Sequence, residues 1–256
     1  MIASLLFGLC LAKTIVAAPA PAQAQTFDVT PAEDDVVVLL EDGNHMLINY
    51  TTWVEKLTFE GFSLTPPELD PDFLNFTGVE SPKGNAQKRD DASCENTKQM
   101  TLDKTERFVD WDIQMSNVVC ATGAMDIFVM SGWSVANSVT ISGGLDLGTW
   151  LKGKLGPSVG VDFGRAWISS QSAQNKGTVR DGNCGVMITK PLTTRRSGRI
   201  LQGCLGATTQ IATWYADDHG TGSYNGVSWI AGAVGMCTKP GTEPPLTRCK
   251  GQGEFV

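Results

Sequence analysis

The sequence has few of the residues that build metal and redox sites. It contains two histidines and no Cys-x-x-Cys pair among its 256 residues. His45 lies in the first third of the chain, so His219 is the only histidine after Arg89. A zinc site with two histidines, or a catalytic pair of histidines, is therefore excluded after Arg89. The missing Cys-x-x-Cys pair removes the main signature of zinc ribbons and thioredoxin-like sites.

Charged residues and long apolar runs are also scarce. Charged side chains make up 18% of the chain, and the net charge of −7 argues against a nucleic-acid binder, which is normally basic. Apart from the extreme N-terminus, no apolar run reaches the roughly 18–20 residues of a membrane-spanning helix. The hydrophobic content of 41% is enough for a core. The composition therefore predicts a folded protein with no nucleic-acid partner and no transmembrane span.

The composition changes sharply near residue 89. Residues 1–89 carry twelve acidic and five basic side chains, and residues 90–256 carry fifteen of each. The whole surplus of −7 (5 − 12) therefore lies in the first part. Five of the 28 glycines but seven of the 12 prolines also lie there. Two segments of different character are joined at this point.

The N-terminus has the pattern of a signal peptide over residues 1–24. An apolar stretch at residues 1–16 is followed by small residues that suit signal peptidase. Cleavage after Ala18, Ala20 or Ala24 stays open. We therefore expect a secreted, extracellular protein.

Residues 25–89 have the character of an acidic, proline-containing propeptide. Asn49 and Asn75 begin Asn-x-Thr triplets that accept N-linked glycans. Lys88-Arg89 offers a dibasic site to a processing protease, so we expect the mature chain, residues 90–256, to begin at Asp90. The alternative is that Lys88 and Arg89 are only a solvated pair of charges.

Six cysteines remain once Cys10 leaves with the signal peptide. An even number in a secreted domain predicts three disulfides, with 15 possible pairings. Only the last two are close enough in sequence to suggest a local loop. The six are Cys94, Cys120, Cys184, Cys204, Cys237 and Cys249.

Apolar and polar residues alternate with the period of a β-strand in many short segments. Residues 109–115 and 159–167 are the clearest, and Asp181-Gly182 predicts a tight turn. One helix is expected, at residues 145–155. The pattern predicts an all-β fold, a disulfide-stabilised β-sandwich or barrel-like domain, whose tryptophans pack in the core.

Two motifs resemble catalytic ones but lack their context. Gly156 to Gly160 match Gly-x-Ser-x-Gly around Ser158, and Asp217-Asp218-His219 follow, but the predicted strand comes after Ser158 instead of before it. Residues 148–154 begin like a phosphate loop, but Leu155 replaces the required Ser or Thr. We therefore expect no catalytic residues, no metal and no cofactor, although a weak ion site at residues 217–219 stays open.

One basic cluster could contact an anionic partner. Pro191 and Gly198 lie among its residues, which predicts an exposed turn at Arg195-Arg196. The alternative is a solvated hairpin whose charges balance acidic residues elsewhere. The cluster consists of Lys190, Arg195, Arg196 and Arg199.

Three segments carry a resemblance to a known family. Residues 103–112 (DKTERFVDWD), 193–199 (TTRRSGR) and 223–229 (SYNGVSW) resemble the Celp effector-like family of small secreted fungal proteins. The likeness covers roughly residues 94–240 and continues more loosely upstream. It implies a fungal, extracellular, effector-like protein and transfers no activity.

Three functions remain after these exclusions. The first is a non-enzymatic effector that binds a host protein, polysaccharide or lipid. The second is a β-hairpin pore former, because two Ser/Thr/Gly-rich segments, residues 131–142 and 158–172, could each supply about 9–11 alternating residues. Asn137, Asp162 and Arg165 interrupt that alternation. A secreted hydrolase comes third, because no coherent set of acid, base and nucleophile is present.

Overall fold

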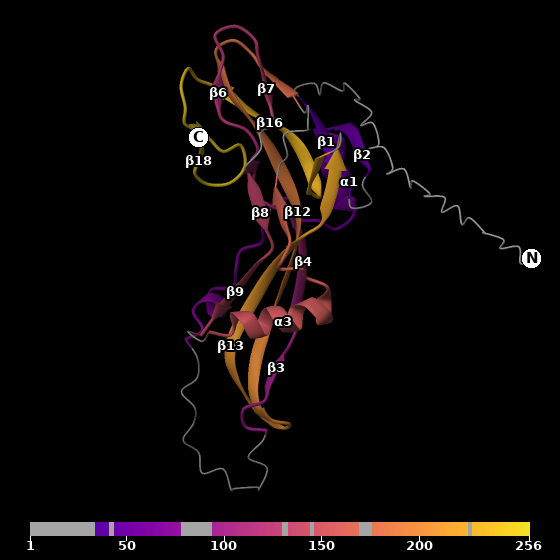
Figure 1. Ribbon diagram of the computed structural model, residues 1–256, viewed down its shortest axis with the longest axis vertical. Helices are drawn as coiled ribbons and strands as arrows, with labels where there is room; N and C mark the ends of the chain where they lie inside the picture. The colour runs from indigo at the N-terminus through magenta and orange to yellow at the C-terminus, as the bar shows by residue number, and fades with distance from the viewer. Residues whose placement is uncertain are drawn as a thin grey trace, which may run out of the picture.

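The computed structural model describes residues 34–40, 44–77, 94–129, 133–143, 146–168, 176–224 and 227–256. The molecule is elongated, and two long antiparallel strands, β12 (Asn183–Cys204) and β13 (Ala207–His219), follow its long axis (Figure 1). The predicted signal peptide and the Lys88-Arg89 pair lie outside the described residues.

The remaining elements are mostly short strands, which pair with these two or with each other. The strands are β1 (Asp35–Leu39), β2 (His45–Asn49), β3 (Lys98–Met100), β4 (Lys104–Val109), β5 (Ile113–Gln114), β6 (Val119–Cys120), β7 (Met125–Phe128), β8 (Ser134–Ala136), β9 (Ser138–Ser142), β10 (Ala166–Ile168), β11 (Lys176–Val179), β14 (Thr221–Tyr224), β15 (Val227–Ile230), β16 (Gly232–Pro240), β17 (Leu246–Thr247) and β18 (Glu254–Phe255). The helices are α1 (Tyr50–Phe59), α2 (Pro71–Leu74) and α3 (Gly148–Val159).

Strand β12 joins the two halves of the main sheet. Its first half pairs with β16 on one edge and with β5 and β6 on the other, and its second half pairs with β13 and with β3 and β4. The change of partner falls at Pro191, which has no N–H to donate to a ladder. The next residue, Leu192, donates to the Ala231 carbonyl at 2.8 Å, just before β16 begins. One strand thus organises the whole length of the molecule.

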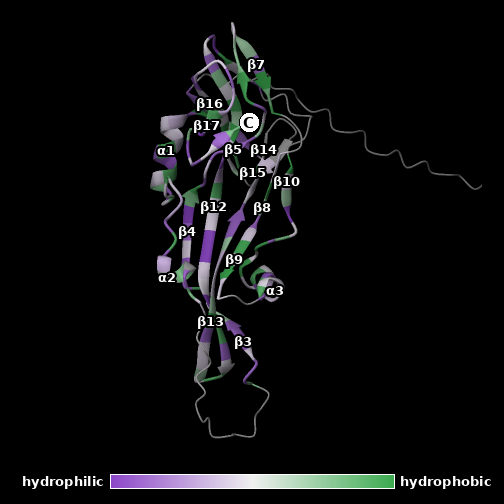
Figure 2. Ribbon diagram, turned by 90° about the vertical axis from the view of Figure 1, so that its left-hand side faces the viewer, coloured by the Kyte–Doolittle hydropathy of each residue, from purple (hydrophilic) through white to green (hydrophobic). Residues whose placement is uncertain are grey.

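Two segments cover opposite faces of β13 (Figure 2). We call residues 34–77 the N-terminal segment and residues 133–168 the hairpin segment. Phe73 of the first contacts Tyr215, and its carbonyl accepts a hydrogen bond from Thr213. Helix α3 of the second packs in an apolar cluster with Trp214. Because side chains alternate along a strand, odd and even positions of β13 face opposite sides.

The core is divided into apolar clusters along the sheet. Trp53 and Leu57 of α1 pack with Val36 and Val109, while α3 packs through its leucines below Trp214. The predicted role of the tryptophans in packing holds for Trp167, Trp214 and Trp229, which are buried. Trp111, in contrast, is 43% exposed.

The six cysteines form three disulfides, as the sequence predicts. Cys94 joins Cys204 at the end of β12, Cys120 joins Cys184, and Cys237 joins Cys249 in the local loop. All three lie within residues 94–256, and none reaches the N-terminal segment. Three bridges are consistent with an extracellular protein.

The all-β prediction is confirmed, with sandwich-like sheets that are not closed into a barrel. The turn at residues 181–182 is confirmed, but several local predictions are wrong. The helix lies at residues 148–159, displaced from 145–155, and only residues 166 and 167 of the expected strand at 159–167 are extended. Arg195-Arg196 form no turn, because both lie in the middle of β12.

Candidate functional site

The four residues of the basic cluster are each paired with an aspartate. Lys190 Nζ lies 2.9 Å from Asp112, Arg195 makes two contacts of 2.7 Å with Asp217, and Arg196 lies 3.0 Å from Asp218. Arg199 contacts Asp103 at 2.7 Å. An anionic partner would have to displace these carboxylates. The arrangement matches the alternative reading of the cluster, in which its charges balance acids elsewhere.

Arg195 is the most enclosed of the four. It lies directly opposite Asp217 in the β12–β13 register, and its guanidinium lies 5.0 Å from the ring centres of both Phe108 and Tyr215. Burial opposes its charge, but the hydrogen bonds and charge of Asp217 raise the pKa of Arg195 above its ordinary value. Such a bidentate pair between aromatic rings fixes two strands together.

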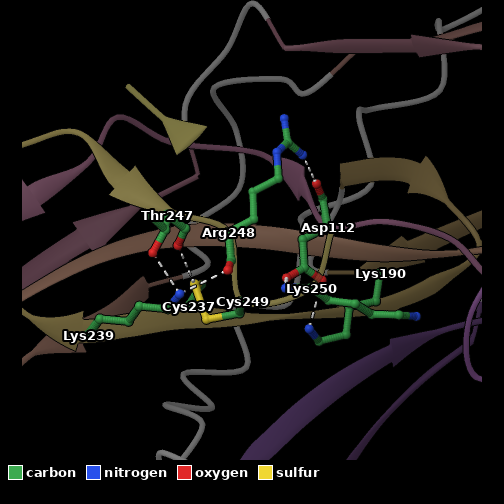
Figure 3. The surroundings of a disulfide bond; sticks show 8 residues. All are labelled: Asp112, Lys190, Cys237, Lys239, Thr247, Arg248, Cys249 and Lys250. Carbon is green, nitrogen blue, oxygen red and sulfur yellow. Dashed lines mark hydrogen bonds and ion pairs between the residues drawn. A yellow bond between two sulfur atoms is a disulfide. The ribbon is translucent and has the colours of Figure 1, made fainter. Parts of the chain in front are cut away.

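Lys190 belongs to a second ion cluster beside the Cys237–Cys249 disulfide (Figure 3). Asp112 is fully buried and accepts hydrogen bonds from Lys190 Nζ and from the backbone N–H of Lys250 at 2.7 Å. Burial, with repulsion from Lys190, lowers the pKa of Lys250 to about 8. The cluster anchors the C-terminal loop. The sequence pattern placed Asp112 on the wet face of a strand, which is wrong because the strand breaks at residues 110–112.

The residues of the catalytic-like motifs do not converge. Ser158 is exposed in the last turn of α3, directly after Pro157. Asp217 and Asp218 are paired with different arginines. His219 is buried, and its Nδ1 lies 2.9 Å from Thr193 Oγ1. Within the described ranges, no group of His, Cys, Asp and Glu has the arrangement of a metal site.

A buried asparagine ties the hairpin segment to the sheet. Asn137 Nδ2 donates to Asp218 Oδ1 and to the Asp162 carbonyl, both at 3.0 Å. Its Oδ1 accepts the backbone N–H of His219 at 2.9 Å. One side chain therefore connects both arms of the segment with the end of β13. The sequence shows Asn137 only as a break in the alternation of apolar and polar residues. Its contact partners are distant in sequence and can be identified only from the structure.

Trp167 makes a second attachment next to the first. Its indole N–H donates to Thr221 Oγ1 at 2.8 Å, and its ring meets the His219 ring edge-on, with 5.8 Å between centres. Burial lowers the pKa of the His219 imidazole, although Asp110, Asp217 and Asp218 oppose this change. The imidazole is thus held in its neutral form where the segment meets the sheet.

The two arms of the hairpin segment have matched alternation. Strands β8 and β10 are antiparallel, with Val135 opposite Trp167 and Ala136 opposite Ala166. Continuing that register by one residue places Asn137 opposite Arg165, so the two polar interruptions fall at the same level. The even positions from 134 to 140 and from 162 to 168 are all exposed. Each arm therefore has one exposed face made of small and polar residues, apart from Ile168, which is 60% exposed.

Helix α3, which connects the arms, has an unfavourable sequence for a helix. It contains Gly153, Gly156 and Pro157, and its N-terminus has no side-chain cap. Glycine costs about 1 kcal/mol and proline about 3 kcal/mol relative to alanine in a helix interior. Leu151 and Leu155, both fully buried against the sheet, hold it in place. Tertiary packing thus imposes this helix against local preference.

Both glycan acceptors are exposed in the N-terminal segment. Asn49 is the N-cap of α1, and its Oδ1 accepts the backbone N–H of Thr51 at 2.9 Å. Asn75 follows α2 directly. Their positions leave both side chains accessible for the predicted modification.

No protein-family model, curated protein or solved structure matches the chain. The resemblance to the Celp effector-like family therefore stays a prediction. Among the described residues, no helix is long and apolar enough to cross a bilayer.

Proposed function

We propose that this is a secreted, non-enzymatic, effector-like protein that acts on a lipid membrane through its hairpin segment. The observation that carries the proposal is the shared register of the two arms. With Val135 opposite Trp167, the large apolar residues of both arms other than Ile168 fall on one face, and the other face carries mainly small and polar residues. Asn137 and Arg165, which break the alternation in sequence, lie opposite each other in that register.

The arms have the length and the faces that a membrane-crossing hairpin needs. If the β8–β10 register continued, residues 134–141 would pair with residues 161–168, which is close to the about 9–11 tilted residues that cross a bilayer. The apolar face would carry Trp133, Val135, Val139 and Ile141 from one arm. The other arm adds Val161, Phe163 and Trp167. Trp133 and Trp167 fall near the same end, where aromatic residues favour the membrane interface.

The polar pair on the apolar face opposes insertion but does not prevent it. An arginine facing lipid costs about 2–4 kcal/mol at the midplane and less near the interface. Asn137 lies opposite Arg165 and can accept a hydrogen bond from it. Each large apolar side chain that passes from water into lipid contributes about 1.5–3 kcal/mol. Val161 and Trp167 are already buried in the docked form, so the partly exposed members of the seven offset the cost of the arginine.

The connection between the arms can change conformation because α3 is weakly specified. Its glycines and proline resist a helix, so the docked form depends on two buried leucines, the β9–β13 pairing and the contacts of Asn137 and Trp167. An isolated hairpin would leave unpaired backbone groups in lipid, so hairpins of several copies must pair edge to edge.

The test combines vesicle leakage with ion selectivity. The secreted protein, before and after cleavage at Lys88-Arg89, is added to vesicles of phosphatidylcholine and phosphatidylserine that contain a fluorescent dye. Ala136 is exposed in the docked form and lies on the polar face. Ala136→Glu should shift planar-bilayer conductance toward cations and Ala136→Lys toward anions. Thr58→Glu and Thr58→Lys, on the exposed face of α1, are the matched controls and should leave selectivity unchanged.

A crosslink gives the complementary result. Val139 lies opposite Ala216 in the β9–β13 register, so Val139→Cys with Ala216→Cys should hold the segment on the sheet and abolish leakage. Vesicle binding without leakage would instead support a surface-binding effector. Loss of leakage in Ser158→Ala, with folding intact, would support the hydrolase.

A further inference from the structure

The N-terminal segment covers the outer edges of two strands that flank β12. Strand β1 pairs with β16, with Val37 opposite Val234 and Leu39 opposite Gly232. Further along the same segment, Ser63 forms a parallel bridge with β4. Its N–H donates to the Arg107 carbonyl, and its carbonyl accepts the Val109 N–H, both at 2.9 Å.

Among the described residues, no other strand pairs with these two edges. Where β16 pairs with β12, its other edge carries β1, and where β4 pairs with β12, its other edge carries Ser63. An uncovered strand edge presents backbone N–H and C=O groups that template pairing with another chain. The segment therefore blocks edge-to-edge contact at two places at once.

Only non-covalent contacts attach this segment, apart from the chain that continues from it. The sequence has no cysteine between residues 25 and 89, and the three disulfides lie within residues 94–256. The contacts include buried Trp53 and the Phe62 ring, which lies 4.0 Å from the Arg107 guanidinium. After a cut at Lys88-Arg89, the segment would be a separate, dissociable chain.

The net charge indicates that a second copy of the chain would take the place of the N-terminal segment. Residues 25–256 carry 27 acidic and 19 basic side chains, once Lys13 is removed with residues 1–24, so their net charge is −8 (19 − 27). Residues 90–256 carry fifteen of each, so their net charge is zero (15 − 15). A net charge near zero favours association between copies, and a large one opposes it. Loss of the N-terminal segment would therefore uncover the edges of β16 and β4 and, at the same time, remove the electrostatic repulsion between copies.

We propose that the N-terminal segment is a removable cap against self-assembly, and that a second copy of the chain takes its place on β16 and β4. Two different edges, one on each strand, allow a head-to-tail contact, which builds a ring or a chain of copies. The cap rests on the predicted cut at Lys88-Arg89 but not on membrane insertion, because assembly is measured in solution without lipid.

The experiment measures molar mass by size-exclusion chromatography with light scattering. Purified residues 25–256 should be monomeric, and after a cut by a dibasic-specific protease and loss of the segment they should form multimers. Val37→Cys with Val234→Cys staples the cap to β16 and should reduce the multimer fraction at least tenfold after the same cut. Thr189→Cys with Val234→Cys is the matched control, because Thr189 lies opposite Val234 on β12 and leaves the cap free.

Each outcome decides the proposal. Equal assembly of the stapled and control proteins would overturn it, as would a cut protein that loses the segment, by intact mass, and stays monomeric. A segment that never dissociates after the cut would also overturn it. Assembly without vesicle leakage would contradict membrane insertion alone, and leakage by the stapled protein would contradict the cap alone.

Discussion

The N-terminal segment and the hairpin segment attach to the sheet in the same way but are built from different sequences. Each adds a five-residue strand to the sheet, β1 next to β16 and β9 next to β13, and each packs one helix through buried apolar residues. Helix α1 starts with the Asn49 cap, whereas α3 has no side-chain cap and includes Gly153 and Pro157. Local preference and tertiary packing agree in the first segment and conflict in the second.

The difference indicates how each segment leaves the sheet. Four consecutive residues of β1, Val36 to Leu39, are buried, while the odd and even positions of β9 differ in exposure. Agreement between local and tertiary preferences gives one well-defined state, and conflict leaves alternatives close in free energy. We therefore expect the N-terminal segment to dissociate as a folded piece after the predicted cleavage, and the hairpin segment to change its own structure.

The largest expected effect is on stability, and it comes from truncating one buried side chain of the N-terminal segment. Trp53 is 1% exposed, so Trp53→Ala should lower the free energy of unfolding by about 3–5 kcal/mol. Urea unfolding measures the loss, and limited proteolysis should cut the N-terminal segment first while α3 stays protected. Phe59→Ala on the same helix is the control, because Phe59 is 94% exposed. Equal protease sensitivity of both segments would show that they are not independent.

The second prediction is that acid loosens the hairpin segment and not the N-terminal segment. Burial holds the pKa of His219 below its ordinary value of about 6.5, so the unfolded imidazole binds protons that the folded one does not. Stability from the neutral form is therefore complete above about pH 6.5 and is lost as the pH falls toward the folded pKa. Proteolysis at residues within the hairpin segment, followed between pH 7.5 and 5, should accelerate.

Two controls sharpen the pH prediction. His219→Gln cannot titrate in this range, so the change in proteolysis of the hairpin segment should flatten. Asp110, Asp217 and Asp218 surround the imidazole and favour its charged form, so their combined effect limits the size of the change. Faster cleavage of the N-terminal segment at acid pH, with the hairpin segment unaffected, would reverse the comparison.

The smallest expected effect comes from raising the helix propensity of α3. A Cβ added at Gly153 meets no atom within 4 Å, so Gly153→Ala should stabilise the helix by about 0.5–1 kcal/mol. Because 1.4 kcal/mol is a factor of ten, vesicle leakage should slow by roughly two- to fivefold. Thr58→Ala improves α1 by a similar amount and should leave leakage unchanged. Faster leakage in Gly153→Ala would mean that the docked helix does not limit insertion.

The features predicted correctly from sequence are those that depend on local pattern. The period-two alternation gave the all-β fold, the even cysteine count gave three bridges, and Asp181-Gly182 gave a turn. The continuity of β12 was missed, because Pro191 and the arginines suggest a break in any local reading. Cross-strand pairing with Asp217 and Asp218, more than 20 residues away, makes that charged stretch part of a strand.

The candidate site was only partly visible in the sequence. Asn137 and Arg165 were recognised as interruptions, but only the β8–β10 register brings them to one level. Helix α3 was expected near its position, but it ends at Val159, the first residue of an expected strand, while Leu151 and Leu155 pack it against the sheet. Processing at Lys88-Arg89, the glycans and the family resemblance stay predictions.

The N-cap of helix α1 has a consequence for the surface of the protein. A sugar attached to Asn49 through Nδ2 leaves Oδ1 free to accept the Thr51 N–H, so glycosylation and helix initiation share one amide without conflict. Asn49 is the last residue of β2, which lies at one end of the strand order β2-β1-β16-β12-β13-β9 in the main sheet. A hydrated glycan at Asn49 would lie beside the outer edge of β2 and would hinder another strand from pairing there. It would leave together with the N-terminal segment that carries it. Copies of the protein would then associate only after the glycosylated N-terminal segment had been lost.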